Sequence, residues 1–168
     1  VRTDYPRVVA AVGLMTGDRE HAEDAVQDAL ARLLADPPTE PLRSVAAWVT
    51  VAARNGAHSR RRRLGAEQRA LTRLSSRAEH RHVTAEASEA TVGQHDDLMA
   101  AIGGLADQQR QICIMHYYLD LAVADIAAAL GVSDGTVKTQ LHRARRTLAA
   151  SLGPTATDDD TGAAPPRP

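Results

Sequence analysis

The sequence predicts an all-α protein of two small helical domains joined by a flexible linker, the second domain containing a helix-turn-helix. Strand signals are nearly absent, and apolar residues recur at the spacing that lines one face of a helix. The length of 168 residues suits one or two domains. Because the apolar pattern dissolves at 64–94, we expect one domain at 1–63 and another at 95–152.

The first two helices are expected at 5–16 and 18–34. The first has an inward face of valines and a methionine, and Gly17 ends it. The second has an apolar inner face and an acidic outer face, and Pro37 and Pro38 end it, because proline cannot continue a helix.

Three polar residues of the second helix, Asp24, Gln27 and Asp28, share one exposed face at spacings i, i+3 and i+4. Such a face is either a solvated surface or a dock for a basic protein surface. The residues alone leave both interpretations open.

The third helix is expected from near Ser44 into a run of arginines, and residues 42–63 contain no Asp or Glu. Trp48 is more typical of a core residue than of a stacking platform, and Asn55 can hydrogen-bond either a base edge or a helix neighbour. Successive helical residues lie about 100° apart, so the arginines cannot all enter one groove and suit phosphates instead. These arginines are Arg60, Arg61, Arg62 and Arg63.

The stretch 64–94 is predicted to be a linker, in part helical, with a few leucines as its only apolar anchors. It contains His80 and His82, but no set of carboxylates and histidines at ligand spacing surrounds them, so we expect no metal site. Two further helices are expected at 97–105 and 107–119. Residues 153–168 are too polar to bury an apolar core and are expected to be a disordered tail.

The stretch 121–148 has the pattern of a helix-turn-helix. Its first helix places apolar residues on one face from Val123 to Leu130, and Gly131 supplies the turn. Ser133 is placed to cap the second helix, because its hydroxyl can accept a backbone N–H that has no partner inside the helix.

The second helix of this motif has two different faces. A narrow apolar stripe, formed by Val137, Leu141, Ala144 and Leu148, must pack against the first helix. The opposite face suits the major groove, where arginine can bond a guanine edge and glycine allows close approach. A solvated basic face is the alternative. The opposite face holds Gly135, Thr139, His142, Arg143 and Arg146, with Lys138 and Arg145 on a flank where phosphates are expected, whereas Gln140 turns toward the buried side.

The composition narrows the classes of function. The formal net charge is −1, so the basic character is local rather than global. The single cysteine, Cys113, excludes an internal disulfide and is expected to be a small buried apolar residue. We expect a cytoplasmic protein, because the sequence shows no signal peptide and no apolar run near the ~20 residues that span a bilayer. No nucleophile and base, paired carboxylates or phosphate-binding glycine loop appears, so we expect neither an enzyme nor a cofactor.

Three stretches carry a resemblance to a known family: TGDREHAEDAVQDALARLL at 16–34, AWVTVAARNGAHSRRRR at 47–63 and LADQQRQICIMHYYLDLAVADIAAALGVSDGTVKTQLHRARRTL at 105–148. The chain resembles a bacterial RNA polymerase sigma factor of the extracytoplasmic-function group, which keeps only regions 2 and 4. The resemblance implies a factor that binds core RNA polymerase and directs promoter-specific initiation at the minus-thirty-five and minus-ten elements. An anti-sigma factor is a further partner to expect.

The resemblance also implies residue roles. Asp24, Gln27 and Asp28 would bind the polymerase. The third helix would bind the minus-ten element: Asn55 would lie at a flipped-base pocket, Trp48 would contact the same DNA, and the arginines at 60–63 would follow its backbone. Region 4 would read the minus-thirty-five element through Lys138, Thr139, Gln140, His142 and Arg143, with Arg146 on the same face.

The chain departs from the family pattern in its aromatic residues, because it has no Phe. Leu30, Leu34, Thr50 and Arg60 stand where the family often has aromatic or large apolar groups, which weakens the expectation of efficient strand opening. The alternative function is a helix-turn-helix regulator that binds DNA without being a polymerase subunit. The acidic and then basic first half argues against that alternative.

Overall fold

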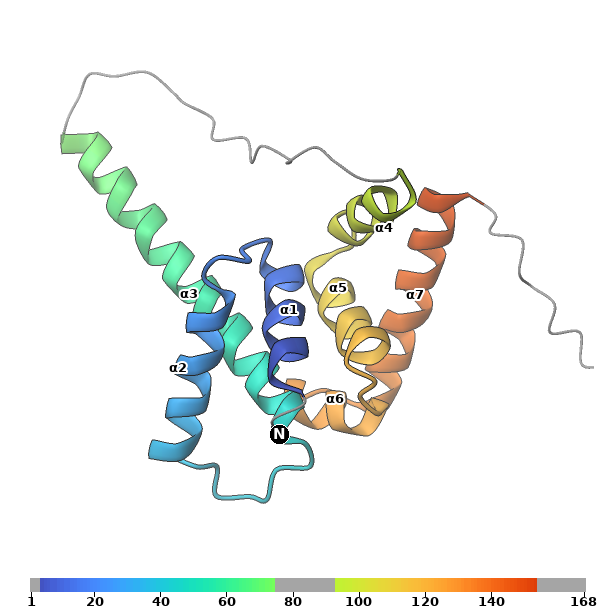
Figure 1. The fold of residues 1–168 in the computed structure, drawn as a ribbon, viewed down its shortest axis with the longest axis horizontal. Helices are drawn as coiled ribbons and strands as arrows, with labels where there is room; N and C mark the ends of the chain where they lie inside the picture. The colour runs from blue at the N-terminus through green and yellow to red at the C-terminus, as the bar shows by residue number, and fades with distance from the viewer. Residues whose placement is uncertain (1–3, 75–92, 154–168) are drawn as a thin grey trace, which may run out of the picture.

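The computed structural model describes residues 4–74 and 93–153, and in these ranges the chain forms seven α-helices, one π-helical segment and no strand (Figure 1). The predicted all-α class is confirmed for these residues. The expectations for the tail at 154–168, for His80 and for His82 lie outside them. The elements are α1 (Tyr5–Thr16), α2 (Ala22–Ala35), α3 (Val45–Leu74), α4 (Gly93–Gly103), α5 (Asp107–Cys113), η1 (Ile114–Tyr118), α6 (Val123–Leu130) and α7 (Asp134–Leu152).

Helices α1, α2 and α3 form the first half of the molecule. Helix α1 has the predicted bounds and ends at Gly17, which takes the left-handed conformation at φ 70°. Small side chains dominate the core between the three helices, so their backbones can approach closely. The buried core consists of Val8, Val12, Ala22, Ala25, Val26, Ala29, Val49 and Ala53.

Helix α2 begins at Ala22, so the predicted start at Asp18 is wrong by four residues. The Asp18 side chain explains the difference. Its Oδ1 accepts a hydrogen bond from the backbone N–H of His21 at 3.1 Å and lies 3.0 Å from the ring Nδ1 of the same residue. This local bonding holds 18–21 in a turn, because a short carboxylate competes with the helix for backbone donors.

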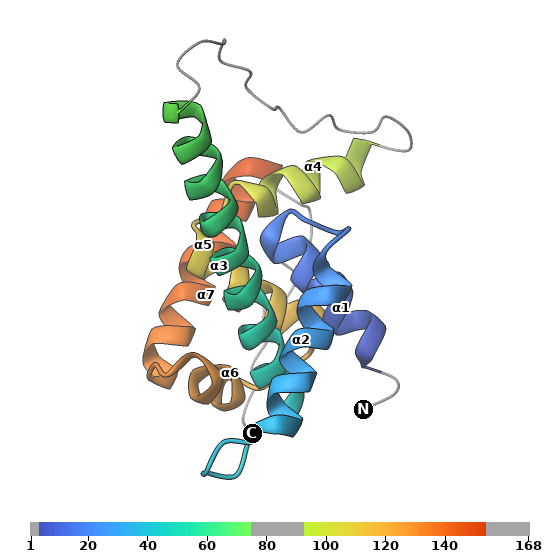
Figure 2. The same ribbon diagram turned by 90° about the vertical axis from the view of Figure 1, so that its left-hand side faces the viewer.

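Helix α3 continues beyond the arginine run to Leu74, into a stretch that the sequence assigned to the linker. It projects past α1 and α2 as a long rod (Figure 2). The remaining expected linker residues, 75–92, lie outside the described residues. The arginines at 60–63 therefore lie inside a helix, which keeps their side chains in the splayed arrangement that a 100° step predicts.

The second half contains α4 to α7. The helix predicted at 107–119 is instead α5 followed by η1, in which the Leu119 N–H bonds the Ile114 carbonyl five residues back at 3.1 Å. Such π-helical turns are rare, and the apolar periodicity does not distinguish them from α-helix.

The helix-turn-helix is confirmed as a pair of helices. Gly131 is left-handed at φ 66°, and the Ser133 hydroxyl accepts the Thr136 N–H at 3.1 Å. This local geometry is encoded by residues close together in sequence.

In α7 the predicted apolar stripe is buried at Val137, Leu141 and Ala144 and half-buried at Leu148. Val137 and Leu141 share a core with α6, as predicted. Ala144 and Leu148 instead pack with Leu105 and Cys113, so the prediction that the whole stripe faces the first helix of the motif is wrong for them.

The two halves pack directly against each other. One apolar core contains residues of both, with Met15 and Ala47 from the first half and Ile112, Met115 and Ile126 from the second. Helix α1 contacts α5 and η1, and α3 contacts α6. The sequence predicted two domains and a linker, but it did not predict this shared core.

Within the described residues, no helix is both long and apolar enough to cross a membrane. Cys113 is buried as predicted, with 6% of the residue exposed, and burial raises the pKa of its thiol.

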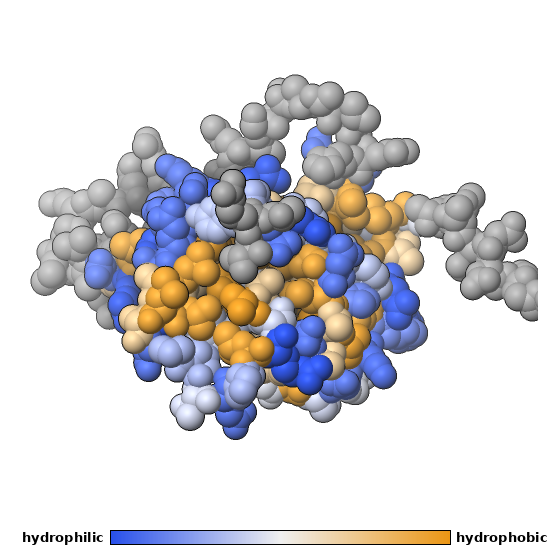
Figure 3. Space-filling view, turned by 60° about the horizontal axis from the view of Figure 1, so that its bottom comes forward, coloured by the Kyte–Doolittle hydropathy of each residue, from blue (hydrophilic) through white to orange (hydrophobic). Residues whose placement is uncertain are grey.

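Apolar side chains reach the surface between charged ones on the face at the lower end of Figure 1, as Figure 3 shows.

Candidate nucleic-acid and protein interfaces

The outer face of α7 is exposed along its first three turns. Lys138, His142, Arg143 and Arg146 are all exposed. Thr139 is exposed as well, and its hydroxyl donates to the Gly135 carbonyl at 2.8 Å. Its methyl group and oxygen lone pairs are therefore what it can offer to a base.

Gln140 is half-buried, on the side of α7 that the helical wheel indicated. The geometry thus separates it from the exposed face described above. Its role in reading bases stays a prediction that rests on the family resemblance.

A cleft of ≈ 690 Å³ lies between α2 and α3 and brings together residues to which the sequence assigned different partners. Trp48, Asn55 and Arg63 line it from α3, and Asp28 lines it from α2. Trp48 is half-buried against the core of the first half, so its prediction as a core residue holds in part. Asn55 is exposed at the cleft.

An ion pair joins the two walls of this cleft, because Arg60 Nη2 lies 2.8 Å from Asp28 Oδ2. Asp28 was predicted to bind polymerase and Arg60 to bind DNA. Both side chains are about half exposed, so the pair is easily exchanged for outside partners.

Arg61 faces another region, the turn between α1 and α2, where it lines a second cleft with Asp18 and His21. Hydrogen bonds from His21 and the nearby Arg61 charge hold the pKa of Asp18 below its usual value. The Asp18 carboxylate in turn raises the pKa of His21. All four arginines at 60–63 are exposed, and Arg61 and Arg63 line different clefts.

Among the arginines of α3 whose side chains the structure describes, Arg54 is the most buried, and the sequence analysis missed it. Its side chain is 13% exposed, and its guanidinium forms an ion pair with Asp107 of α5. Its Nη1 also donates to the Asn55 Oδ1 at 3.2 Å. The two partners Arg54 and Asp107 are 53 residues apart, so no local spacing could have indicated their contact.

His58 lies one turn further along α3, with its Nε2 3.9 Å from Asp107 Oδ1. Burial, together with the Arg54 charge, lowers the pKa of His58. Burial raises the pKa of Asp107, but the hydrogen bond and charge of Arg54 outweigh it and leave that pKa below its usual value. Asp107 therefore stays a carboxylate facing the α3 cation.

The outer face of α2 exposes Asp24, Gln27 and Asp28, as predicted. Gln27 Nε2 lies 3.4 Å from the hydroxyl of Tyr5, which ties this face to α1. Leu34, at the carboxyl end of α2, is 85% exposed, an unusual position for a large apolar side chain.

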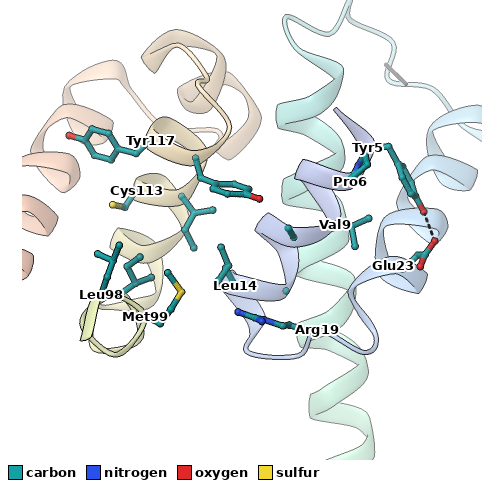
Figure 4. Close-up of a pocket in the computed structure, with 15 residues that line it drawn as sticks. Tyr5, Pro6, Val9, Leu14, Arg19, Glu23, Leu98, Met99, Cys113 and Tyr117 are labelled. Carbon is teal, nitrogen blue, oxygen red and sulfur yellow. Dashed lines mark hydrogen bonds between the residues drawn. The ribbon is translucent and has the colours of Figure 1, made fainter. Parts of the chain in front are cut away.

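A third cleft, ≈ 840 Å³ in volume, lies between α1 and the pair α4 and α5 (Figure 4). Leu14 from α1 faces Leu98 and Met99 from α4 across it, and Arg19 lies at one end. The two halves are thus packed together on one side and separated on this one. Within the described ranges no group of histidine, cysteine or carboxylate side chains could hold a metal ion.

The fold and these surfaces define a two-part helical protein with a helix-turn-helix in its second half and basic faces on α3 and α7. The model of the family described as "Sigma-70 region 2" matches residues 1–67, and the model of the family described as "Sigma-70, region 4" matches residues 95–148. The two matched stretches together include the basic parts of α3 and α7 and the acidic face of α2.

Relatives are similar over most of the chain. The ECF RNA polymerase sigma factor SigL of Mycobacterium tuberculosis is 31% identical over 82% of this chain and 78% of that protein. The sigma factor EcfG of Rhodopseudomonas palustris is 29% identical over 82% of this chain and 75% of that protein. The solved sigma factor RpoE of Bartonella quintana, in complex with the anti-sigma factor NepR, has a TM-score of 0.64 and 26% identity, covering 88% of this chain and 91% of that one.

The chain therefore belongs to the extracytoplasmic-function sigma factors, which direct RNA polymerase to promoters. The resemblance found in the sequence is confirmed.

Proposed function

We propose that the two halves divide promoter recognition between them. Residues 1–63 bind core RNA polymerase and the minus-ten element, residues 95–152 bind the minus-thirty-five element, and 64–94 connect them. The chain supplies no catalytic group, acts in the cytoplasm, and leaves RNA synthesis to the polymerase. The exposed, capped face of α7 is the observation that carries this proposal.

In the second half, Arg143 and His142 read base edges and Arg146 extends the same face. Their exposure on one side of α7, opposite a buried stripe, supports this assignment. Lys138 binds phosphate from the flank, and Thr139 contributes its methyl group or an acceptor. Gln140 has the weakest geometric support, because it is half-buried.

In the first half, the cleft between α2 and α3 receives the opened minus-ten strand. Asn55 hydrogen-bonds a base, Trp48 packs at the cleft, and the arginines at 60–63 bind phosphates on several sides. The exposure of Asn55 at the cleft supports this role. Thr50, which stands at an often aromatic family position, is fully buried and donates to the Ala46 carbonyl at 2.7 Å, so it offers no wedge to DNA.

The exposed face of α2 binds the polymerase through Asp24, Gln27 and Asp28. Leu34 adds an apolar contact at the end of that helix, because its 85% exposure leaves it open to a partner. The solved Bartonella quintana relative carries an anti-sigma factor, which supports such an inhibitor as a further partner for this chain.

The decisive experiment is transcription of fragmented genomic DNA from the source organism by core polymerase, with and without this protein. Sequencing the transcript 5′ ends should show a set of start sites that appears only with the protein and shares two upstream motifs. A DNA-binding regulator that is not a polymerase subunit would change start sites only with another sigma factor present. Failure of core polymerase to bind the protein would refute the proposal.

A further inference from the structure

The cleft between α1 and the pair α4 and α5 is a large apolar site that the proposed function leaves unused. Its volume is ≈ 840 Å³, and its walls come from both halves of the molecule. Pockets for small molecules have volumes of about 300–1,000 Å³, are mostly apolar and lie preferentially at domain interfaces. The cleft has all three properties (Figure 4).

Apolar side chains gather at this cleft without being covered. Leu98 of α4 and Tyr117 and Tyr118 of η1 line it and are exposed. Leu14 of α1 faces Leu98 and Met99 from the opposite wall. A contiguous apolar patch marks a binding site, whereas apolar side chains exposed singly need no explanation. The cleft is therefore a candidate for a ligand with a large apolar part.

A single cation lies at one end of the cleft. Arg19 is the only cation among the described residues that line it, and it forms no ion pair within the described ranges (Figure 4). Glu23 is the only carboxylate of the lining, and it accepts a hydrogen bond from the Tyr5 hydroxyl at 3.3 Å. The Arg19 guanidinium thus has donors available to an anion at the end of an apolar cleft.

Gly13 explains how Arg19 reaches this position. It lies inside α1, and a Cβ at this residue would be 3.2 Å from Arg19 Cγ and 3.4 Å from Arg19 Cα. Glycine inside a helix weakens that helix. Here its missing side chain makes room for the stem of Arg19 to cross α1, and the guanidinium then lies at the end of the cleft.

The dimensions favour a small molecule over a partner helix. A helix about 10–12 Å across, with a pitch of about 5.4 Å, fills about 500 Å³ per turn. The cleft would therefore hold fewer than two turns of such a helix. An alkyl chain is several times thinner, so the same volume accommodates a long one.

We propose that this cleft binds a free fatty acid, with the alkyl chain between α1 and α4 and the carboxylate on the Arg19 guanidinium. Removal of the chain from water supplies the attraction, and the charge-assisted hydrogen bonds to Arg19 fix the head. This inference concerns a ligand of the free chain and does not depend on the residue roles proposed above.

The test measures binding of decanoate to the full-length chain by isothermal titration calorimetry, below the concentration at which decanoate forms micelles. Binding should be saturable, with a single site per chain. Decanol has the same alkyl chain without the carboxylate and should bind about tenfold more weakly, because it makes no hydrogen bond between opposite charges. If decanoate shows no saturable binding, the proposal is wrong.

Arg19→Ala tests the position of the carboxylate. It should weaken decanoate binding about tenfold and leave decanol binding unchanged. Arg62→Ala is the matched control, because Arg62 is exposed, carries the same charge and does not line the cleft. The control should change neither affinity. Equal decanoate affinities for the two variants would refute the assignment of the carboxylate to Arg19.

Leu98→Asp tests the apolar wall. A carboxylate in this wall should weaken the binding of both decanoate and decanol about tenfold, because the ligand chain would lie against a charge. Leu64→Asp is the control, since Leu64 is an exposed leucine of α3 outside the cleft. Leu98→Ala replaces Leu98→Asp if that variant fails to fold by circular dichroism. Unchanged affinities would place the ligand elsewhere and overturn the proposal.

A second copy of the chain is the competing occupant of the cleft. Sedimentation velocity of the unchanged chain distinguishes the two, because the proposal expects a monomer. A dimer that Leu98→Asp dissociates and Leu64→Asp does not would mean that the cleft is an interface between copies. That result would overturn the fatty-acid site.

Discussion

Helices α7 and α3 carry the two basic faces of the molecule, but their cations are held differently. On α7 the cations at 138–146 are exposed, and none has a carboxylate partner within the described parts of the chain. On α3, Asp107 binds Arg54 and Asp28 binds Arg60. Under the proposed function, the α7 face meets DNA directly, whereas among the described arginines of α3 only Arg54 and Arg60 have a protein carboxylate to exchange and the arginines at 61–63 are exposed.

The largest expected effect comes from reversing charge on α2. Asp24→Lys combined with Asp28→Lys should abolish binding to core polymerase, because it replaces an acidic docking face with a basic one. Binding is measured by gel filtration or biolayer interferometry with unchanged helical circular dichroism. The control Glu20→Lys with Glu40→Lys makes the same change of net charge off this face. If the first variant still binds polymerase, the exposed face of α2 is only a solvated surface and not a polymerase-binding site.

A smaller effect is expected from the α7 face. Arg143→Ala should cost about 1–3 kcal/mol of discrimination between a promoter and a scrambled duplex if its guanidinium meets a base. Arg145→Ala, on the flank, should weaken binding to both duplexes alike. Anisotropy titrations with both duplexes measure the difference. Equal losses for Arg143→Ala would assign that residue to phosphate and weaken the contrast between the two helices.

The preformed character of α7 depends on its cap. Ser133→Ala should destabilise the protein by about 1 kcal/mol, because the Thr136 N–H loses its acceptor. Urea denaturation measures the change. Ser151→Ala in the same helix is the control, since Ser151 bonds a carbonyl of its own helix and caps nothing. An unchanged midpoint for Ser133→Ala would mean that tertiary packing alone orders the start of α7.

The smallest expected effect concerns the turn before α2. The pKa of His21 is raised in the folded protein, so His21 stabilises the fold fully below pH 6.5. This stabilisation is lost as the pH rises past the pKa of His21 in the folded state. The pKa of Asp18 is lowered in the folded protein, so Asp18 stabilises the fold fully above pH 3.8. This stabilisation is lost as the pH falls past the pKa of Asp18 in the folded state. His21→Gln should therefore lower the melting temperature near pH 5.5 and not at pH 9. A constant difference would exclude this ion pair as the cause.

Local signals in the sequence predicted most of the helical structure. The bounds of α1, the left-handed Gly131 and the Ser133 cap all follow from residues within one or two turns of each other. The exposed and buried faces of α7 follow from helical periodicity alone. Errors arose where a side chain competed with the helix, as Asp18 does before α2, and where periodicity cannot distinguish helix types, as at η1.

The sequence by itself determined the helices, their apolar stripes and the residue types on each exposed face, because these depend on neighbours along the chain. Only the tertiary structure decided that the two halves share a core and that Asp107 reaches Arg54. Such contacts depend on how whole helices pack, and a pairing of residues 53 apart leaves no periodic trace. The tertiary structure therefore distinguishes the basic face of α7, whose cations have no carboxylate partner in the described residues, from that of α3, where Arg54 and Arg60 are paired. The number and order of charges along the chain do not show this difference.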